Sequence, residues 1–260
     1  MTDFPLSAGR DREMVRHETK RRTLTVIRRA QLTDTLVRFT FTSDDHFDGF
    51  VSLGPEDHVK VFFPAEDVPA ARDYTPGDFR PGGADGAELD LDFVVHGDAG
   101  PATAWASNAE VGTELEIGGP RGSRLAPSGF RNVVLVADAS GTPALRRWLL
   151  AYQGVSPVKA ILFGPDARLT DYFSDHERQL AGIEESWTDE SKLLDRVTGQ
   201  DIDGDTFVWA AGEANALIPI RSWLKNEKGL GAPNLSLHGY WRAGEAALGD
   251  HAPIDPSDPD

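Results

Sequence analysis

One change in hydrophobic pattern divides this chain into two regions that require different folds. From Thr23 to Ile117 the apolar residues come in short alternating runs separated by glycine and proline turns, which is typical of antiparallel strands facing a core on one side. After the Pro127-Ser128-Gly129 turn, Val133–Ala137 is a continuous apolar run that leads into a glycine-containing turn and a helix. Such a run indicates a parallel strand covered on both faces. The sequence therefore predicts two domains.

The fold class expected from these patterns is a β domain followed by an α/β domain. Six short strands and one small helix at 101–108 predict a six-stranded antiparallel barrel. The later strands alternate with helices, which predicts a doubly wound parallel sheet. The expected boundaries are an N-terminal arm at 1–22, a barrel at 23–127, a nucleotide-type domain at 128–246 and an acidic, disordered tail at 247–260.

Composition excludes several classes of function. The chain has no cysteine, which excludes thiolate-bound iron–sulfur clusters and a cysteine nucleophile, so any electron carrier must be an organic cofactor or a substrate. The net charge of -16 argues against nucleic acid as a partner. The seven histidines show no metal-binding spacing, so no metal site is expected. No apolar run approaches the roughly 20 residues that span a bilayer, and no secretory signal is evident, so we expect a cytoplasmic protein without membrane insertion.

The first domain carries a pattern that suits a flavin. Arg72, Tyr74 and Thr75 lie at a strand end, where Tyr74 could pack on the ring, Thr75 reach a ring nitrogen and Arg72 pair with phosphate. Farther on, a strand ending at His96 runs into a glycine turn and a helix opened by Pro101, whose uncapped N-terminus could take a pyrophosphate. Each piece alone is also explained by strand preference or helix capping; together they favour FAD.

The second domain carries weaker signals for a nicotinamide dinucleotide. The Ser140-Gly141-Thr142 turn follows the first strand, at the edge where such sheets bind nucleotides, and Gly212-Glu213 ends another strand at the same edge. A glycine turn joining strand to helix also occurs without a ligand. Asp166 could accept hydrogen bonds from the ribose hydroxyls, which would favour NADH. Because Arg168 lies nearby in the sequence, the choice between NADH and NADPH stays open.

The motifs taken together resemble the siderophore-interacting proteins, FAD-dependent ferric-siderophore reductases of the ferredoxin-reductase-like group. The resemblance runs from about Thr23 to Gly244, and it rests on these segments: Arg72-x-Tyr74-Thr75, Leu91–Gly97, Gly100-Pro101-Ala102-x-x-Trp105-Ala106, Gly119–Ser123, Ala211-Gly212-Glu213 and Gly239-Tyr240-Trp241-Arg242-x-Gly244. It implies FAD in the barrel, NADH or NADPH as electron donor, and a ferric siderophore as substrate.

The chain also departs from that family. Pro76-Gly77 follows the Tyr-Thr pair where the family has a second arginine shortly after, and Ala137–Ala144 lacks the family's glutamate. The segment Ile161–Asp166 also differs from the family pattern. These changes leave FAD binding intact and put the electron donor and the iron substrate in question.

The pattern and the resemblance define the candidate site residues. Those expected to bind FAD are Arg72, Tyr74, Thr75, Asp92, Phe93, Val94, Val95, His96, Gly100, Pro101, Ala102, Thr103, Trp105 and Gly119. Those expected at the nicotinamide nucleotide are Ser140, Gly141, Thr142, Gly212 and Glu213, and Trp241 is expected to contact a bound cofactor. Because the acidic protein would repel an anionic chelate, a local cationic patch is expected at the substrate, from Lys60, Arg121 and Arg242. No residue is expected to act in proton transfer, since the cofactor carries the redox chemistry.

Three alternatives remain open on this sequence. One is a general NAD(P)H:flavin or quinone oxidoreductase on the same scaffold. Another is a non-catalytic ferric-siderophore-binding flavoprotein. The last is an electron-transfer module that takes electrons from a reduced ferredoxin, which the missing family glutamate keeps under consideration.

Overall fold

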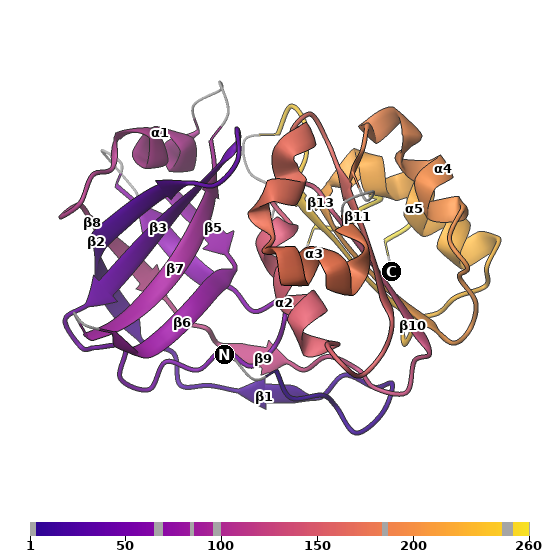
Figure 1. Ribbon diagram of the computed structural model, residues 1–260, viewed down its shortest axis with the longest axis horizontal. Coiled ribbons are helices and arrows are strands. Elements are labelled where there is room, and N and C mark those ends of the chain that lie inside the picture. The colour runs from indigo at the N-terminus through magenta and orange to yellow at the C-terminus, as the bar shows by residue number, and fades with distance from the viewer. Residues whose placement is uncertain are drawn as a thin grey trace. The chain divides into compact units, whose positions relative to one another are not determined.

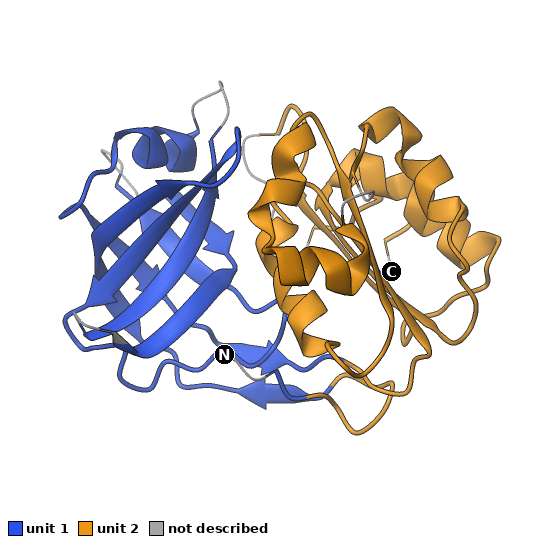
Figure 2. Cartoon of the chain, in the orientation of Figure 1, with its two compact units in different colours: residues 1–5, 13–126 blue, residues 6–12, 127–260 orange. Residues whose placement is uncertain are grey.

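The computed structural model describes residues 4–64, 70–83, 86–95, 100–183, 187–245 and 252–259. The chain forms two compact units, shown in different colours in Figure 2. The first comprises residues 1–5 and 13–126, and the second comprises residues 6–12 and 127–260. The mixed β and α/β architecture expected from the sequence is confirmed. No helix in the described ranges combines the length and the apolar character needed to cross a membrane.

The first unit is built on one curled antiparallel sheet (Figure 1). Its order is β5-β4-β8-β2-β3-β7-β6. The strands are β2 (Arg21–Gln31), β3 (Leu36–Ser43), β4 (Val59–Phe63), β5 (Ala70–Tyr74), β6 (Pro76–Gly83), β7 (Gly86–Val94) and β8 (Glu114–Gly118). The helix α1 (Pro101–Asn108) and a two-stranded sheet of β1 (Met14–Arg16) and β9 (Gly122–Arg124) complete the unit.

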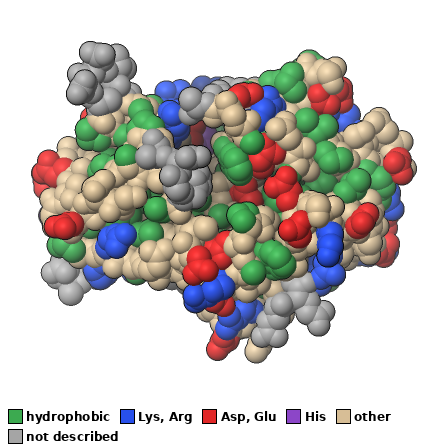
Figure 3. Space-filling model, turned by 90° about the horizontal axis from the view of Figure 1, so that it is seen from above, with side chains coloured by type: hydrophobic (Ala, Val, Ile, Leu, Met, Phe, Trp, Pro, Cys, Tyr) green, Lys and Arg blue, Asp and Glu red, His purple; other side chains and the backbone are tan. Residues whose placement is uncertain are grey.

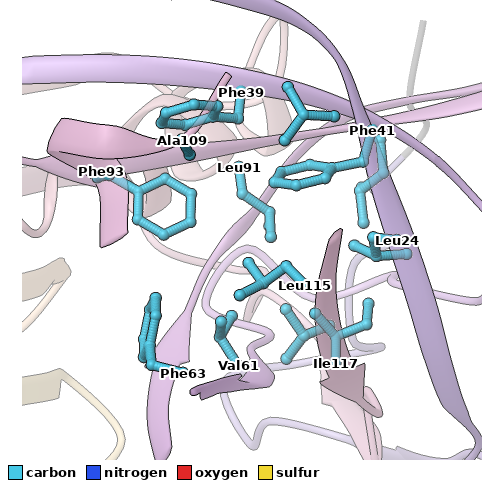
Figure 4. Packing of buried hydrophobic residues seen from close by; sticks show 14 of the residues in the cluster. Leu24, Phe39, Phe41, Val61, Phe63, Leu91, Phe93, Ala109, Leu115 and Ile117 are labelled. Carbon is cyan, nitrogen blue, oxygen red and sulfur yellow. The ribbon is translucent and has the colours of Figure 1, made fainter. Parts of the chain in front are cut away.

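Alternate residues of these strands point into one core. In β7, Leu89, Leu91 and Phe93 are fully buried, and they meet buried aromatic residues of β3 and β4, including Phe39 and Phe63 (Figure 4). Phe93 lies edge-on to Phe39, with ring centroids 5.3 Å apart. The alternation of apolar and polar residues that predicted these strands therefore also identifies the residues that point into the core.

The expectation of a closed six-stranded barrel is wrong, because the sheet has seven strands and ends at β5 and β6. The strand that the expected count leaves out is β6, because Pro76–Gly83 is rich in glycine and proline and lacks apolar alternation. An edge strand tolerates proline because it pairs on one side only. Gly77 is also required there, since a Cβ atom would lie 3.0 Å from the Asp90 carbonyl oxygen of β7.

The second unit holds a parallel five-stranded sheet of order β12-β11-β10-β13-β14 (Figure 1). The strands are β10 (Asn132–Ala137), β11 (Val158–Phe163), β12 (Trp187–Thr188), β13 (Thr206–Glu213) and β14 (Leu235–Trp241). The helices are α2 (Thr142–Ala151), η1 (Ala167–Tyr172), α3 (Asp175–Ala181), η3 (Glu190–Lys192), α4 (Leu193–Thr198) and α5 (Ala214–Asn226). The strand order reverses between β10 and β13, and in such sheets the crevice at the carboxyl ends of these two strands is the usual nucleotide site.

Helices cover both faces of this sheet. On one face, residues of α4 and α5 such as Val197 and Leu217 pack against Val134 and Val208. On the other, the Trp148 ring of α2 contacts Phe207, with centroids 5.2 Å apart. This double cover explains why the central strands are apolar throughout rather than alternating.

Both chain ends differ from the sequence expectation. The N-terminal arm is not irregular throughout, because it contains β1 and because Arg10 donates to the Gly204 carbonyl oxygen (2.9 Å) and to the Gly129 carbonyl oxygen in the second unit. In the segment predicted to be disordered, residues 252–259 are ordered. Ile254 is buried in the core cluster of the second unit, and Asp258 pairs with Arg221 of α5.

Candidate functional site

Tyr74 is at the C-terminal end of β5 and belongs to an aromatic group in the first unit. Its ring lies 4.5 Å from that of Phe93 on β7, centroid to centroid, and 6.0 Å from that of Phe63 on β4. Trp105 of α1 reaches the same group, 5.2 Å from Phe93. Burial raises the pKa of the Tyr74 phenol well above its ordinary value. Tyr74 is therefore a neutral aromatic surface that is half-buried at the strand end.

Arg72 and Thr75 share this strand end with Tyr74. Arg72 and Tyr74 are two residues apart on β5, so their side chains leave the same side of the strand. Arg72 Nη1 donates to the Ala71 carbonyl oxygen at 2.7 Å. Thr75 is half-buried and lies between β5 and β6. The structure thus gathers a cation, a ring and a hydroxyl within four residues.

The side chain of Asp92 is occupied by an ion pair. Arg38 Nε donates to its Oδ1 at 2.7 Å and Arg38 Nη2 donates to its Oδ2 at 2.8 Å, a bidentate pair that buries the carboxylate. The Asp92 carboxylate is therefore engaged by the protein itself, and a cofactor contact at this residue stays a prediction. Next to it, Phe93 is wholly buried, whereas Val94 and Val95 are half-buried and nearer the surface.

The N-terminus of α1 is open. Gly100 is the exposed N-cap residue, Pro101 occupies the first turn, and no side-chain cap or acidic residue is present there among the described residues. A Cβ atom on Gly100 would meet no atom within 4 Å. Ala102 and Thr103 are half-buried. An uncapped helix end with no acidic residue in its first turn fits an anion such as a phosphate. His96, which the sequence placed in this site, lies outside the described residues.

The structure also places Gly119 and the three cations expected at the substrate. Gly119 is buried after β8 with a φ of +97°, which explains the glycine without a ligand. Lys60 Nζ pairs with Asp73 Oδ1 at 3.0 Å. Arg121 is exposed. Arg242 is held by the C-terminal segment, because its Nη2 donates to the carbonyl oxygens of Pro253 and Ile254. Arg242 is half-buried and also pairs with Glu245, and its contact with a substrate stays a prediction.

In the second unit, Asp138 joins three strand ends. Its Oδ1 accepts the amides of Ser140 (2.8 Å) and Gly141 (3.1 Å) and the Ser140 hydroxyl (2.6 Å). Its Oδ2 accepts the Glu213 amide at 2.9 Å and the Trp241 indole N–H at 2.7 Å. Burial raises the pKa of Asp138, while the hydrogen bonds from Ser140, Trp241 and Gly141 favour its ionised form. All five donors are neutral, so no ion pair cancels the charge.

This network changes the expected role of the Ser140-Gly141-Thr142 turn. The two amides that would face a pyrophosphate already donate to Asp138. The Thr142 hydroxyl donates to the Asp138 carbonyl oxygen at 2.7 Å and is buried. Gly141 is needed for packing, because a Cβ atom would lie 2.7 Å from the Ala211 carbonyl oxygen. The turn is therefore filled by the chain's own carboxylate instead of being open to a phosphate.

Gly212 and Glu213 are fixed in the same way. A Cβ atom on Gly212 would lie 2.6 Å from the Asp138 carboxyl carbon, and the residue has a φ of +149°. Glu213 Oε2 accepts the Ala216 amide at 2.7 Å and caps α5, while its Oε1 accepts the Ala243 amide at 3.0 Å. Both residues therefore organise the sheet edge. The Trp241 side chain, 42% exposed at the end of β14, is accessible to a ligand at this edge.

Sequence reasoning singled out the turn but assigned no role to the Asp138 side chain. A signal was present, since an acidic residue directly follows a wholly apolar strand and precedes Ser-Gly. Such a carboxylate must be satisfied locally, because a buried charge needs hydrogen bonds. Its distant partners, Glu213 and Trp241, could not be read from local sequence.

Comparisons with known sequences agree with the two-part fold. Residues 64–124 match the family model of the siderophore-interacting FAD-binding domain, and residues 130–244 match that of the siderophore-interacting protein. An NADPH-dependent ferric-chelate reductase of Escherichia coli is 33% identical over 89% of this chain and 96% of its own length. A ferric acinetobactin reductase of Acinetobacter baumannii is 29% identical over 70% of this chain and 64% of its own length.

A solved structure supports the same assignment. The siderophore utilization protein from T. fusca superposes with a TM-score of 0.79 and 29% sequence identity, covering 93% of this chain and all of the other. A siderophore-interacting protein from Acinetobacter baumannii, 20% identical with a TM-score of 0.72, shares the fold.

Proposed function

The chain belongs to the siderophore-interacting protein family, and we propose that it is an FAD-dependent reductase that moves electrons from NADH or NADPH to the Fe(III) of a ferric siderophore, releasing Fe(II). The proposal extends to a cytoplasmic location, which cell fractionation would test. It assigns FAD to the region 23–127 and the nicotinamide nucleotide to a doubly wound sheet in the region 128–246, which the strand order β12-β11-β10-β13-β14 supports.

The observation that carries the proposal is the open N-terminus of α1 together with the aromatic group at Tyr74. An uncapped helix end offers amide donors to a pyrophosphate without competition from a side chain. The neutral Tyr74 ring offers a flat surface to an isoalloxazine, and Arg72 adds a cation at the same strand end. When bound, FAD supplies the change from two-electron hydride transfer to single-electron transfer. The protein residues bind and orient it.

For the substrate, the proposal keeps Lys60, Arg121 and Arg242. Lys60 pairs with Asp73, so an anionic chelate would have to compete for its ammonium group. Arg121 is exposed and accessible to a chelate. With this sparse cationic surface, a neutral or cationic hydroxamate chelate suits the protein better than a trianionic catecholate.

Anaerobic titration of the purified protein with NADPH and NADH tests the proposal. We expect the flavin absorption near about 450 nm, a general flavin property, to bleach with one equivalent of donor and to return when a ferric hydroxamate is added. A colourless protein that does not take up FAD would refute the proposal. Binding of the chelate without bleaching by either nucleotide would instead favour the non-catalytic carrier, and equal rates with quinones would favour a general oxidoreductase.

A further inference from the structure

Trp241 is a half-exposed side chain that is nevertheless fixed in position. It is 42% exposed and, within the described part of the chain, is the sole aromatic residue among the large exposed hydrophobics. Its Nε1 donates to the buried Asp138 Oδ2 at 2.7 Å, which holds the indole by one edge. An indole held in this way can offer its face to a planar ligand, and the rotamer entropy that such a contact normally costs is already lost.

The surroundings of this ring are acidic. The Asp138 carboxyl group accepts hydrogen bonds from the neutral donors described above, and Glu213, the last residue of β13, lies opposite Trp241 in the sheet register. Glu190 of η3 lies close enough that Glu213 and Asp138, after burial, raise the pKa of its carboxyl. Arg242 follows Trp241 in the chain, and its guanidinium is held by Glu245 and by the Pro253 and Ile254 carbonyl oxygens. The carboxyl groups of Asp138 and Glu213 at the indole, with Glu190 near both, form an environment that favours a cationic ring over a neutral one.

The two forms of a nicotinamide differ in just this property. The oxidised ring is a pyridinium cation, and the reduced dihydropyridine ring is neutral. A cation over the face of tryptophan gains electrostatic attraction from the ring quadrupole, and tryptophan is the strongest such partner. Nearby carboxylates add to this attraction for the oxidised ring and contribute little for the reduced ring.

Building on the nicotinamide-dependent function proposed above, we propose that Trp241 is the platform for the nicotinamide ring and selects its oxidised form, with Asp138 as the residue that positions the indole. The product of hydride loss then binds more tightly than the donor. This difference favours hydride transfer to the flavin in the bound state, and it makes the oxidised nucleotide a strong product inhibitor.

Equilibrium binding measures this selection without turnover. The FAD-loaded protein is titrated by calorimetry at low salt with NADP+ and with 1,4,5,6-tetrahydro-NADP, an unreactive analogue with an uncharged ring. We expect NADP+ to bind about five- to tenfold more tightly, the size of a cation–π contact at a partly exposed site. Trp241→Leu should bring the two affinities together, and Trp241→Phe should give an intermediate ratio.

Charge and positioning are tested by separate variants. Glu190→Gln should lower the ratio about twofold through the loss of one neighbouring charge. Glu227→Gln at the exposed C-terminal end of α5 is the matched control and should leave the ratio unchanged. Asp138→Asn should reduce the ratio, and it should add nothing in the Trp241→Leu background, because it acts through the indole.

Equal affinities in the native protein, or a preference that survives Trp241→Leu, would overturn the inference while the reductase function stands. If neither nucleotide binds, the titration is repeated with NAD+ and 1,4,5,6-tetrahydro-NAD; failure of all four to bind would reject the nicotinamide donor itself, and the inference with it. If Asp138→Asn does not fold, the Trp241 variants still decide the question, since their side chain is at the surface.

Discussion

At the scale of single residues, Gly100 is a position where the requirement of the fold differs from the requirement of FAD binding. It caps α1 with extended backbone, and a Cβ atom there would meet no neighbour within 4 Å. The fold therefore does not require glycine at this position. A bound pyrophosphate does require that no negative charge stand at the helix end.

We expect Gly100→Asp to keep or slightly raise the thermal stability of the apoprotein, because aspartate is a good N-cap residue. The same change should weaken FAD binding about tenfold or more, since a carboxylate would occupy the amides meant for phosphate. Fluorescence titration of the apoprotein with FAD measures the effect, and Gly100→Ala is the neutral control. Unchanged FAD affinity in Gly100→Asp would exclude α1 as the phosphate site.

Gly212 presents the opposite case. A side chain there would collide with the Asp138 carboxyl group at 2.6 Å, and the φ of +149° is unfavourable for any other residue. Gly212→Ala should lower the free energy of unfolding by about 2 kcal/mol or more. Urea denaturation followed by circular dichroism gives the difference. Gly204→Ala, where a Cβ atom finds open space in the same unit, should change it little.

At the scale of elements, β7 carries a ladder of ion pairs on the side opposite the core. Glu88, Asp90 and Asp92 are buried alternately with the core residues. They are covered by three arginines from neighbouring strands, namely Arg28 of β2, Arg38 of β3 and Arg80 of β6. The ladder joins four strands and secures the edge strand β6, which has few apolar residues of its own.

The ladder makes part of the stability dependent on pH. Hydrogen bonds from Arg28 and then Arg80 lower the pKa of Glu88 to about 2, from an ordinary value of 4.5. A lowered folded-state pKa means that the stabilisation is complete above the unfolded-state value and is lost as pH falls toward the folded-state value. The stability advantage of the native protein over Glu88→Gln should therefore shrink between about pH 5 and pH 2. Urea unfolding at several pH values tests this, and a constant difference would contradict it.

The elements also show how far the sequence could predict this structure. Hydrophobic periodicity gave the two-part fold, the strand end at Tyr74 and the helix opened by Pro101, because these features are local. It missed β6, whose pairing depends on Arg80 reaching Glu88 and Asp90 rather than on apolar alternation. It also could not show that Asp92 and Arg242 are occupied, since their partners are distant in the chain or lie in a segment without hydrophobic pattern.

At the scale of the whole molecule, charge is the dominant property. The chain has 42 acidic and 26 basic residues, and acidic side chains are spread across the face shown in Figure 3. A long-range field of this sign slows the approach of anions and is screened by salt.

We therefore expect kcat/KM for a trianionic ferric catecholate to rise about threefold or more between roughly 10 and 200 mM salt, as the screening length shortens. The value for a neutral ferric hydroxamate should stay nearly constant. Stopped-flow reoxidation of the reduced flavin with each chelate provides both rates. A catecholate rate that is highest at low salt would contradict the expectation and would show that Lys60 and Arg121 outweigh the global field.

The second unit is assembled from two separate stretches of chain, and this affects its synthesis. Arg10 and Arg12 leave the ribosome before the first unit is complete, yet their partners Asp205 and Ser236 are made only after it. The N-terminal segment must therefore stay available while more than a hundred residues of the other unit emerge and fold. A gene divided after Ala126 would yield a C-terminal half without these anchors, so the natural order of translation is part of how this protein reaches its final form.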